Sequence, residues 1–274
     1  MLTRPIPSTG EALPVVGIGT WQGFDISGGE SERSARREIL AALFAAGGTV
    51  IDASPMYGRA EAVVGEELTE ISGHERAFVA TKVWTRGRSR GIRQMGDSMQ
   101  LLGVNTIDLM QIHNLVDWST QLDTLQAWRD EGRIRYVGIT HYTTSAFDEM
   151  EDVMRRETLD FVQLPYSIGL TGAAERLLPL AVDRGVAVII NRPFEGGGLF
   201  ASVRGEALPG WAREAGCVSW SQFFLEFILA HPAVTCVIPG TSNPENALAA
   251  LVAGSKRLPD EAEARRMHEH WQRL

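Results

Sequence analysis

The stretch "TVIDASPMYG", residues 49–58, is a short apolar run that ends in a carboxylate, Asp52, and continues into a loop that carries Tyr57. The run shows no alternation of polar and apolar residues, which is typical of a strand buried on both faces, as in a parallel sheet. Sequences with helical periodicity flank it at residues 30–47 and 59–70. The stretch therefore predicts one strand-and-helix unit of an α/β fold.

The same unit recurs along the whole chain. Strand candidates lie at 15–21, 49–54, 77–84, 107–113, 134–142, 161–167, 186–194 and 234–241. Helix candidates follow them at 30–47, 59–70, 90–102, 119–131, 145–157, 173–184, 217–230 and 244–252. Because every strand is followed by a helix and no linker interrupts the series, we predict a closed (β/α)8 TIM barrel, with residues 1–274 forming a single domain.

Two segments lie outside the repeating units. Residues 4–14, "RPIPSTGEALP", are expected to form a short hairpin over the bottom of the barrel. Residues 195–216 are expected to form a loop or lid, because loops of that length are uncommon without a function.

Composition and charge narrow the function classes. The chain has 274 residues, of which 44% are hydrophobic and 22% charged, as in ordinary globular proteins. A formal net charge of −8 argues against nucleic acid or an anionic membrane as the main partner. The first ten residues contain no apolar run, and Cys217 and Cys236 are expected to be reduced thiols. These features predict a cytoplasmic protein.

Four polar residues stand at or just beyond three neighbouring strand ends: Asp52, Tyr57, Lys82 and His113. The carboxyl ends of the strands of such a barrel meet at one mouth, so these side chains are expected to converge there. Asp52 and Lys82 are expected to pair, because burying either charge alone is costly. The ammonium would lower the pKa of the Tyr57 phenol and make it a general acid, with His113 polarising the same substrate oxygen.

Each of these residues also has an ordinary structural explanation. Asp52 alone could cap a helix, Lys82 could form a structural ion pair, His113 could be a core histidine and Tyr57 a loop aromatic. Their occurrence together on three consecutive strands or loops favours a catalytic site. No histidine or cysteine spacing is typical of zinc ligands, so no metal site is predicted.

Five motifs together resemble the aldo-keto reductases, a family of (β/α)8 oxidoreductases that use a nicotinamide cofactor. They are "IDASPMYG" (51–58), "ATKVW" (80–84), "LMQIHN" (109–114), "GRIRYVGITHY" (132–142) and "IPGTSNPE" (238–245). The resemblance implies that Tyr57 is the proton donor, that Lys82 lowers its pKa, that Asp52 supports the lysine and that His113 orients the carbonyl.

The resemblance also implies a set of cofactor contacts. Around the nicotinamide, these residues are Gly19, Thr20, Trp21, Asp52, Thr140, His141 and Gln163. Along the pyrophosphate they are Asn191, Arg192, Pro193, Phe194, Gly196, Gly197 and Gly198. Near the adenosine 2′-phosphate they are Gly240, Thr241, Ser242, Asn243 and Asn246, where backbone N–H groups at a helix start would suit an anion. The implied substrate pocket consists of Trp21, Tyr57, Trp84 and His113.

The chain departs from the family pattern in two places. Asn191 stands where many relatives carry an aromatic residue that stacks on the nicotinamide. After the eighth strand, Asn246, Leu248 and Ala250 stand where many relatives carry an arginine and an asparagine, which removes a bidentate contact to phosphate. The cations that could substitute are Arg192, Lys256 and Arg257. NADP(H) is therefore the preferred cofactor and NAD(H) the alternative.

Three functions follow from this pattern. The first is an NAD(P)H-dependent oxidoreductase that reduces an aldehyde or ketone, a small-molecule carbonyl substrate, and acts as a monomer or small homo-oligomer. The second is a regulatory or binding subunit that senses a nicotinamide nucleotide. The third is a lyase or isomerase that uses the same acid–base groups without hydride transfer.

Overall fold

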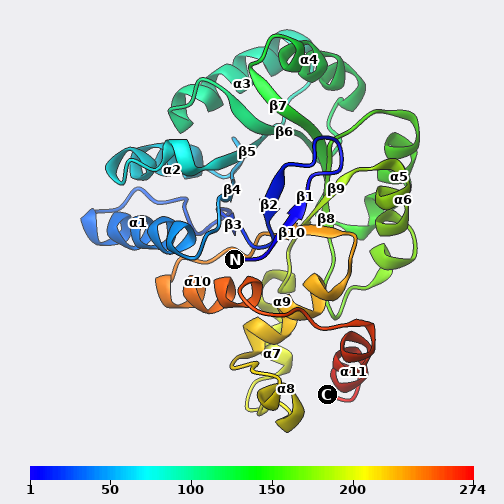
Figure 1. Ribbon diagram of the computed structural model, residues 1–274. Helices are drawn as coiled ribbons and strands as arrows, with labels where there is room; N and C mark the ends of the chain where they lie inside the picture. The colour runs from blue at the N-terminus through cyan, green and yellow to red at the C-terminus, as the bar shows by residue number, and fades with distance from the viewer.

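Eight parallel strands form the centre of the computed structural model, which describes all 274 residues. They are β3 (Ile18–Gly19), β4 (Val50–Asp52), β5 (Phe78–Val83), β6 (Ile107–His113), β7 (Ile134–Thr140), β8 (Phe161–Pro165), β9 (Ala187–Asn191) and β10 (Val234–Val237). Each pairs with the next along the chain, and isolated bridges from Val16 to Val237 and from Gly19 to Gly240 join the two edges. The predicted closed barrel is confirmed (Figure 1).

A ring of helices surrounds the strands (Figure 1). The helices that return the chain are α1 (Glu30–Ala45), α2 (Ala60–Glu70), α3 (Arg88–Leu102), α4 (Trp118–Asp130), α5 (Phe147–Arg156), α6 (Leu177–Arg184), α9 (Trp220–Ala230) and α10 (Pro244–Leu251). Short 3-10 helices lie at 74–76, 144–146, 172–175, 195–197 and 252–254, and α11 (Glu261–Trp271) ends the chain. The large hydrophobic core lies between the strands and this ring.

Alternation along the strands separates that core from a second one inside the barrel. On β5, Val79 and Val83 belong to the outer core, whereas Phe78 and Ala80 belong to the cluster inside the barrel. Successive side chains of a strand point to opposite faces, so Lys82 continues the inward series one layer above Ala80. Strand β5 therefore places apolar side chains inside the barrel and the Lys82 ammonium at the mouth of the barrel.

The hairpin predicted over the bottom of the barrel is present. Strands β1 (Thr3–Pro5) and β2 (Ala12–Pro14) pair in antiparallel fashion, and Figure 1 shows them in front of the barrel strands. Ile6 and Leu13 are buried and join the cluster inside the barrel. These two apolar side chains close the end of the barrel opposite the mouth.

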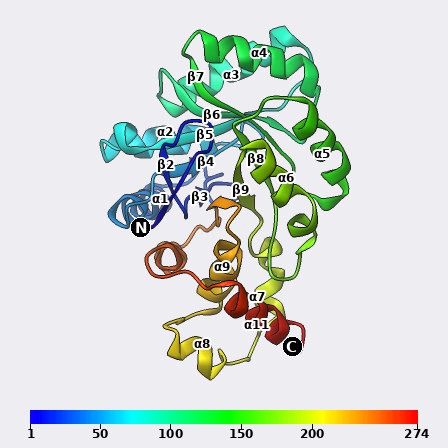
Figure 2. The ribbon, with the colours of Figure 1, turned by 45° about the vertical axis from the view of Figure 1, so that its right-hand side comes forward.

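The expectation of a loop at residues 195–216 is wrong in part. This segment contains α7 (Gly198–Ser202) and α8 (Gly210–Glu214), which Figure 2 shows beside α9 and α11. Leu199, Val203 and Ala212 are buried in the outer core, so apolar contacts order the segment.

Several element ends also differ from expectation. Strand β3 covers only residues 18–19, because Val16 contacts β10 through a single bridge instead of a continuous ladder. Helix α9 begins at Trp220 and not at residue 217, because the Ser219 hydroxyl accepts the Gln222 N–H and caps the helix there. The helix expected at 173–184 begins as a 3-10 turn at 172–175 and becomes α-helical at Leu177.

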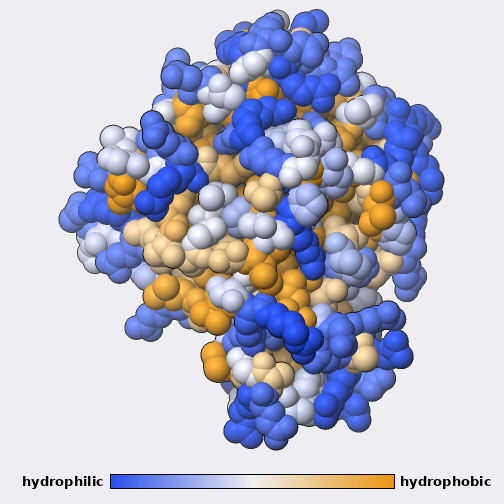
Figure 3. All heavy atoms as spheres, viewed as in Figure 1, coloured by the Kyte–Doolittle hydropathy of each residue, from blue (hydrophilic) through white to orange (hydrophobic).

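The surface is mainly hydrophilic at its periphery, with smaller groups of hydrophobic residues toward the middle and near α10 (Figure 3). None of the helices combines the length and the apolar character that crossing a bilayer requires.

Candidate active site

An ion pair lies at the mouth of the barrel, between β4 and β5. Lys82 Nζ donates to Asp52 Oδ2 at 2.6 Å and to the Ala53 carbonyl at 2.7 Å. The Lys82 side chain is 0% exposed and that of Asp52 is 2% exposed. The predicted pairing of these two side chains is confirmed. Each charge is compensated in a place from which water is excluded.

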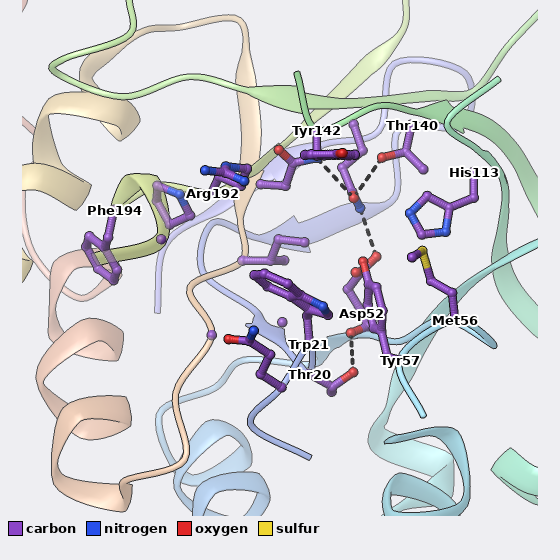
Figure 4. Close-up of a pocket in the computed structure, with 18 of the residues that line it drawn as sticks. Thr20, Trp21, Asp52, Met56, Tyr57, His113, Thr140, Tyr142, Arg192 and Phe194 are labelled. Atoms are coloured by element: carbon purple, nitrogen blue, oxygen red, sulfur yellow. Dashed lines mark hydrogen bonds between the residues drawn. The ribbon is translucent and has the colours of Figure 1, made fainter. Parts of the chain in front are cut away.

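The second oxygen of Asp52 accepts hydrogen bonds from two side-chain amides. Gln163 Nε2 donates to Asp52 Oδ1 at 2.8 Å, and Gln111 Nε2 donates to the same atom at 3.3 Å. The Thr140 hydroxyl donates to Gln163 Oε1 at 2.9 Å, and Figure 4 marks hydrogen bonds that lead from Thr140 to Asp52. The carboxylate is therefore fixed from both sides.

Tyr57 comes to the same place from the loop after β4. Its N–H donates to the Ser54 carbonyl at 2.9 Å, which forms a tight turn between the strand and α2. Lys82 Nζ lies 4.8 Å from the centre of the Tyr57 ring, and the Tyr57 and His113 ring centres are 5.9 Å apart, edge to face. Figure 4 shows Tyr57, Asp52 and His113 around one hollow. The structure brings all four predicted residues together.

The pKa of Tyr57 differs from expectation. Burial raises the pKa of the phenol above its ordinary value of 10.0, and the opposing effect of Lys82 does not cancel this, since Asp52 also raises it. The expected net lowering of the pKa of Tyr57 is therefore wrong. Lys82 still lowers the cost of forming a phenolate, while burial keeps the resting phenol protonated.

The lysine itself is held in its charged form. Burial by itself lowers the pKa of the Lys82 ammonium, but Asp52 and Tyr57 together outweigh it and raise the pKa above its ordinary value of 10.5. At neutral pH, Lys82 is therefore a cation, paired with Asp52, beside a neutral phenol.

His113 is a neutral imidazole. Burial, followed by the nearby Lys82 charge and then His141, lowers the pKa of His113 to about 2. Its Nδ1 lies 3.1 Å from the Ser54 hydroxyl oxygen. A neutral ring offers one N–H donor and one acceptor nitrogen, so this residue can donate a hydrogen bond without carrying charge.

The lowered pKa of His113 predicts how stability depends on acid. Between pH 6.5 and about 2 the unfolded chain binds a proton at this residue that the folded chain does not bind, so stability rises with pH in this window. We expect the free energy of unfolding of His113→Asn to fall less steeply with decreasing pH than that of the wild type. The difference in slope should be up to about 1.4 kcal/mol per pH unit. Urea unfolding at pH 7, 6 and 5 measures this difference. Equal slopes for the two proteins would contradict the prediction.

A cavity of about 640 Å³ opens above these residues, within the range of small-molecule sites. All four predicted substrate-pocket residues line it. The predicted cofactor residues that also line it are Gly19, Thr20, Asp52, Thr140, Gln163, Asn191, Arg192, Pro193, Phe194, Gly196, Gly197 and Gly240. Most of the set expected from the sequence therefore surrounds one space.

Six predicted cofactor residues lie outside the cavity wall: His141, Gly198, Thr241, Ser242, Asn243 and Asn246. The start of α10 offers fewer free donors than expected, because Asn243 Oδ1 accepts the N–H groups of Glu245 at 2.8 Å and Asn246 at 3.3 Å. Glu245 adds a negative charge to the first turn.

Other wall residues were not anticipated. They are Gln22, Met56, Asn114, Tyr142, Phe200 and Ile238. Met56 and Asn114 lie inside motifs already singled out, so their spacing from Tyr57 and His113 could have identified them. Gln22, Asn114 and Arg192 have φ angles of 58°, 53° and 49°, a conformation that L-residues seldom adopt and that is frequent at functional sites.

Arg36 of α1 is a buried cation that joins two loops at the mouth. Its Nε donates to the Gly23 carbonyl at 2.7 Å, and one terminal nitrogen lies 3.5 Å from the Ser242 carbonyl oxygen. Gly23 and Ser242 belong to the loops after β3 and β10, where the barrel closes. No signal in the sequence distinguished this arginine from its neighbours on the helix.

No group of three histidine, cysteine, aspartate or glutamate side chains is arranged to hold a metal ion. Cys217 and Cys236 are buried and form no disulfide.

A sequence model of the "Aldo/keto reductase family" matches residues 15–272. "Aldo-keto reductase YhdN" of Bacillus subtilis (strain 168) is 28% identical over 201 residues, which are 68% of this chain and 60% of that protein, less than two thirds of its length. "NADH-specific methylglyoxal reductase" of Escherichia coli (strain K12) is 28% identical over 239 residues, covering 76% of this chain and 72% of that protein.

A solved structure with a similar fold is an aldo-keto reductase from Klebsiella pneumoniae in complex with NADPH. It superposes with a TM-score of 0.83 at 21% identity, and the match covers 99% of this chain and 96% of the other.

Proposed function

Because this chain belongs to the aldo/keto reductase family, we propose that it reduces the carbonyl group of an aldehyde or ketone with NAD(P)H. The observation that carries the proposal is the buried Lys82 ammonium, 4.8 Å from the centre of the Tyr57 ring at the mouth of a cavity. A charge of this kind is needed where a phenol must give up a proton and regain it.

The residues of the cavity suit a nicotinamide dinucleotide. Asn191 Oδ1, on the cavity wall, is a buried acceptor without a protein partner, which fits an amide donor of a nicotinamide. A Cβ atom at Gly19 would lie 3.0 Å from the Ile238 carbonyl oxygen, so a larger residue would push the two backbones apart by a few tenths of an ångström. When bound, the dihydronicotinamide supplies the hydride that reaches the carbonyl carbon.

The chain's own groups act on the carbonyl oxygen. Tyr57 holds its proton at rest, because burial raises the pKa of the phenol, and gives that proton to the oxygen as charge develops there. Lys82 stabilises the phenolate that remains, and Asp52 keeps the lysine in place at 2.6 Å. His113 is neutral, its ring centre lies 5.9 Å from that of Tyr57, and it donates a hydrogen bond to the same oxygen.

Cofactor preference follows from the start of α10. We propose NADP(H), as the sequence predicts, but with a smaller preference over NAD(H) than an arginine contact to the 2′-phosphate would provide. Glu245 and the capping Asn243 support this, since they add negative charge and occupy two N–H groups. One E. coli relative is named as an NADH-specific enzyme, which supports a weak preference.

The substrate side of the cavity has aromatic walls. Trp21 is 49% exposed and Trp84 is 41% exposed, and the Trp84 and His113 ring centres are 6.4 Å apart. Half-exposed indoles beside a reaction centre can cover a carbonyl compound and exclude water. Two relatives from E. coli are named methylglyoxal reductases, so methylglyoxal belongs among the first compounds to test.

Loss of nucleotide absorbance on adding methylglyoxal or an aromatic aldehyde tests the proposed function, with NADPH and NADH compared in parallel. Turnover that requires both the carbonyl and the nucleotide supports a reductase. Nucleotide binding without turnover of any carbonyl favours a sensing subunit, and absence of binding favours a lyase or isomerase.

Arg36→Leu tests the role of the two loops joined by this residue. Removing hydrogen bonds from a charged donor to the Gly23 and Ser242 carbonyls frees both loops, so we expect NADPH to bind about 10-fold more weakly. Fluorescence titration measures the change. The control is Arg93→Leu, an exposed arginine of α3, and an equal effect of the two substitutions would contradict the assignment.

We also propose a cytoplasmic location and a monomer or small homo-oligomer. The two buried cysteines without a disulfide support a reducing compartment.

A further inference from the structure

Ser54 contacts both Tyr57 and His113, the two residues proposed to act on the carbonyl oxygen. Its backbone carbonyl accepts the Tyr57 N–H at 2.9 Å, and its hydroxyl oxygen lies 3.1 Å from His113 Nδ1. The residue is fully buried, so water does not compete for these contacts. One side chain at the end of β4 thus connects the turn that carries the phenol with the ring of the imidazole.

The direction of the hydrogen bond between Ser54 and His113 follows from the other contacts of the hydroxyl. Its oxygen accepts the Met56 N–H at 3.3 Å, and the only acceptor within reach of its proton is His113 Nδ1. A hydroxyl that accepts one bond and donates another uses both functions, whereas the opposite direction leaves its proton unused in a buried place.

The remaining ring nitrogen of His113 faces the cavity. His113 lines the cavity wall, and its Nε2 has no protein partner, yet it is not among the buried unpartnered atoms. A neutral imidazole whose Nδ1 accepts a hydrogen bond carries its single proton on Nε2. That N–H is then directed to where a ligand oxygen would lie.

We propose that Ser54 is a positioning residue that holds His113 as the Nε2–H tautomer, so that His113 donates a hydrogen bond to the substrate carbonyl oxygen. The catalytic part of this inference rests on the proposed reductase function, while the tautomer does not. In the opposite tautomer, Nε2 presents a lone pair to the carbonyl oxygen, which also carries lone pairs, and the contact becomes repulsive. Ser54 therefore decides whether His113 assists or opposes the reaction.

The tautomer can be read without turnover. Two-bond nitrogen–proton NMR spectra of protein labelled with 15N-histidine distinguish a protonated Nε2 from a protonated Nδ1, and His113→Asn assigns the signals among the six histidines of the chain. We expect the wild type to show the Nε2–H pattern. In Ser54→Ala we expect a mixture of tautomers or the Nδ1–H form, and in Ser54→Thr, which keeps the hydroxyl, the wild-type pattern.

Kinetics test the consequence for catalysis. We expect Ser54→Ala to lower kcat about 10-fold, the effect of one net hydrogen bond, with the KM for the nucleotide unchanged. In a His113→Asn background the same substitution should have no further effect, because the ring that Ser54 holds is gone. Ser98→Ala is the matched control, because Ser98 is also a buried serine but lies on α3.

The possible results distinguish a failure of the tautomer inference from a failure of the proposed function. A wild-type protein with Nδ1–H, or a Ser54→Ala variant with an unchanged tautomer and unchanged kcat, overturns the inference. If the wild type turns over no carbonyl compound, the proposed function fails, and the NMR spectra still decide which tautomer Ser54 selects.

Discussion

Tyr57→Phe is expected to lower kcat for carbonyl reduction by about 100- to 10,000-fold, the range that general acid–base catalysis contributes. The substitution removes only the hydroxyl, so the turn from Ser54 to Tyr57 and the packing against Lys82 and His113 are kept. Steady-state kinetics with NADPH and an aldehyde measure the loss. Nucleotide binding, followed by fluorescence, should change little.

The matched control is Tyr166→Phe. Tyr166 is also buried, and burial raises the pKa of its phenol to about 12, but it packs against Phe227 away from the cavity. Its loss should leave kcat within a factor of about 2, as for a substitution outside the site. A Tyr57→Phe protein that keeps most of its activity would show that another group protonates the carbonyl oxygen.

Lys82→Met is expected to lower both the stability of the protein and its activity. It leaves the Asp52 carboxylate buried without its cation, and breaking a buried pair from one side costs about 3–5 kcal/mol. Urea unfolding measures this loss. The double variant Asp52→Asn/Lys82→Met removes both charges and should recover part of the stability, while neither protein should reduce carbonyls.

The pH window of this effect follows from the direction of the pKa shift. The folded pKa of Lys82 is raised above 10.5, so its contribution to stability is fully present below that pH and is lost as the pH rises through the folded value. Unfolding measured at pH 7 and 8 therefore includes the full contribution of Lys82 to stability.

Arg156→Met, at an exposed pair with Asp152, is the control and should cost less than about 1 kcal/mol of stability. A similar loss in both variants would contradict the assignment of a buried pair.

The sequence predicted the barrel and the convergence of the four residues because both depend on local patterns. Strand β6 occupies residues 107–113, as expected, since its apolar run has clear limits. Lys82 and His113 face inward by the alternation of their strands, which can be read from the sequence. The strand expected at residues 15–21 is longer than the observed β3, because the pairing of this segment depends on β10 at the other end of the chain.

What the sequence could not predict depends on contacts between distant elements. The role of Gln111 follows from its register opposite Lys82, which places its amide next to Asp52. The pKa of Tyr57 was predicted in the wrong direction, because the amount of burial depends on every loop around the mouth. The sequence predicts that Asn243 contacts an anion, but its side chain caps α10 instead. This contact depends on the conformation of the turn before the helix.

The hairpin of β1 and β2 has a consequence for the order of events at the site. The apolar cluster to which Ile6 and Leu13 belong fills the barrel below the site, so we expect ligands to reach the site from the mouth alone. For the proposed reaction we therefore expect the ligand that binds deeper in the cavity to bind first and to leave last. The closed end of the barrel, opposite the mouth, would then determine the order in which ligands bind and leave.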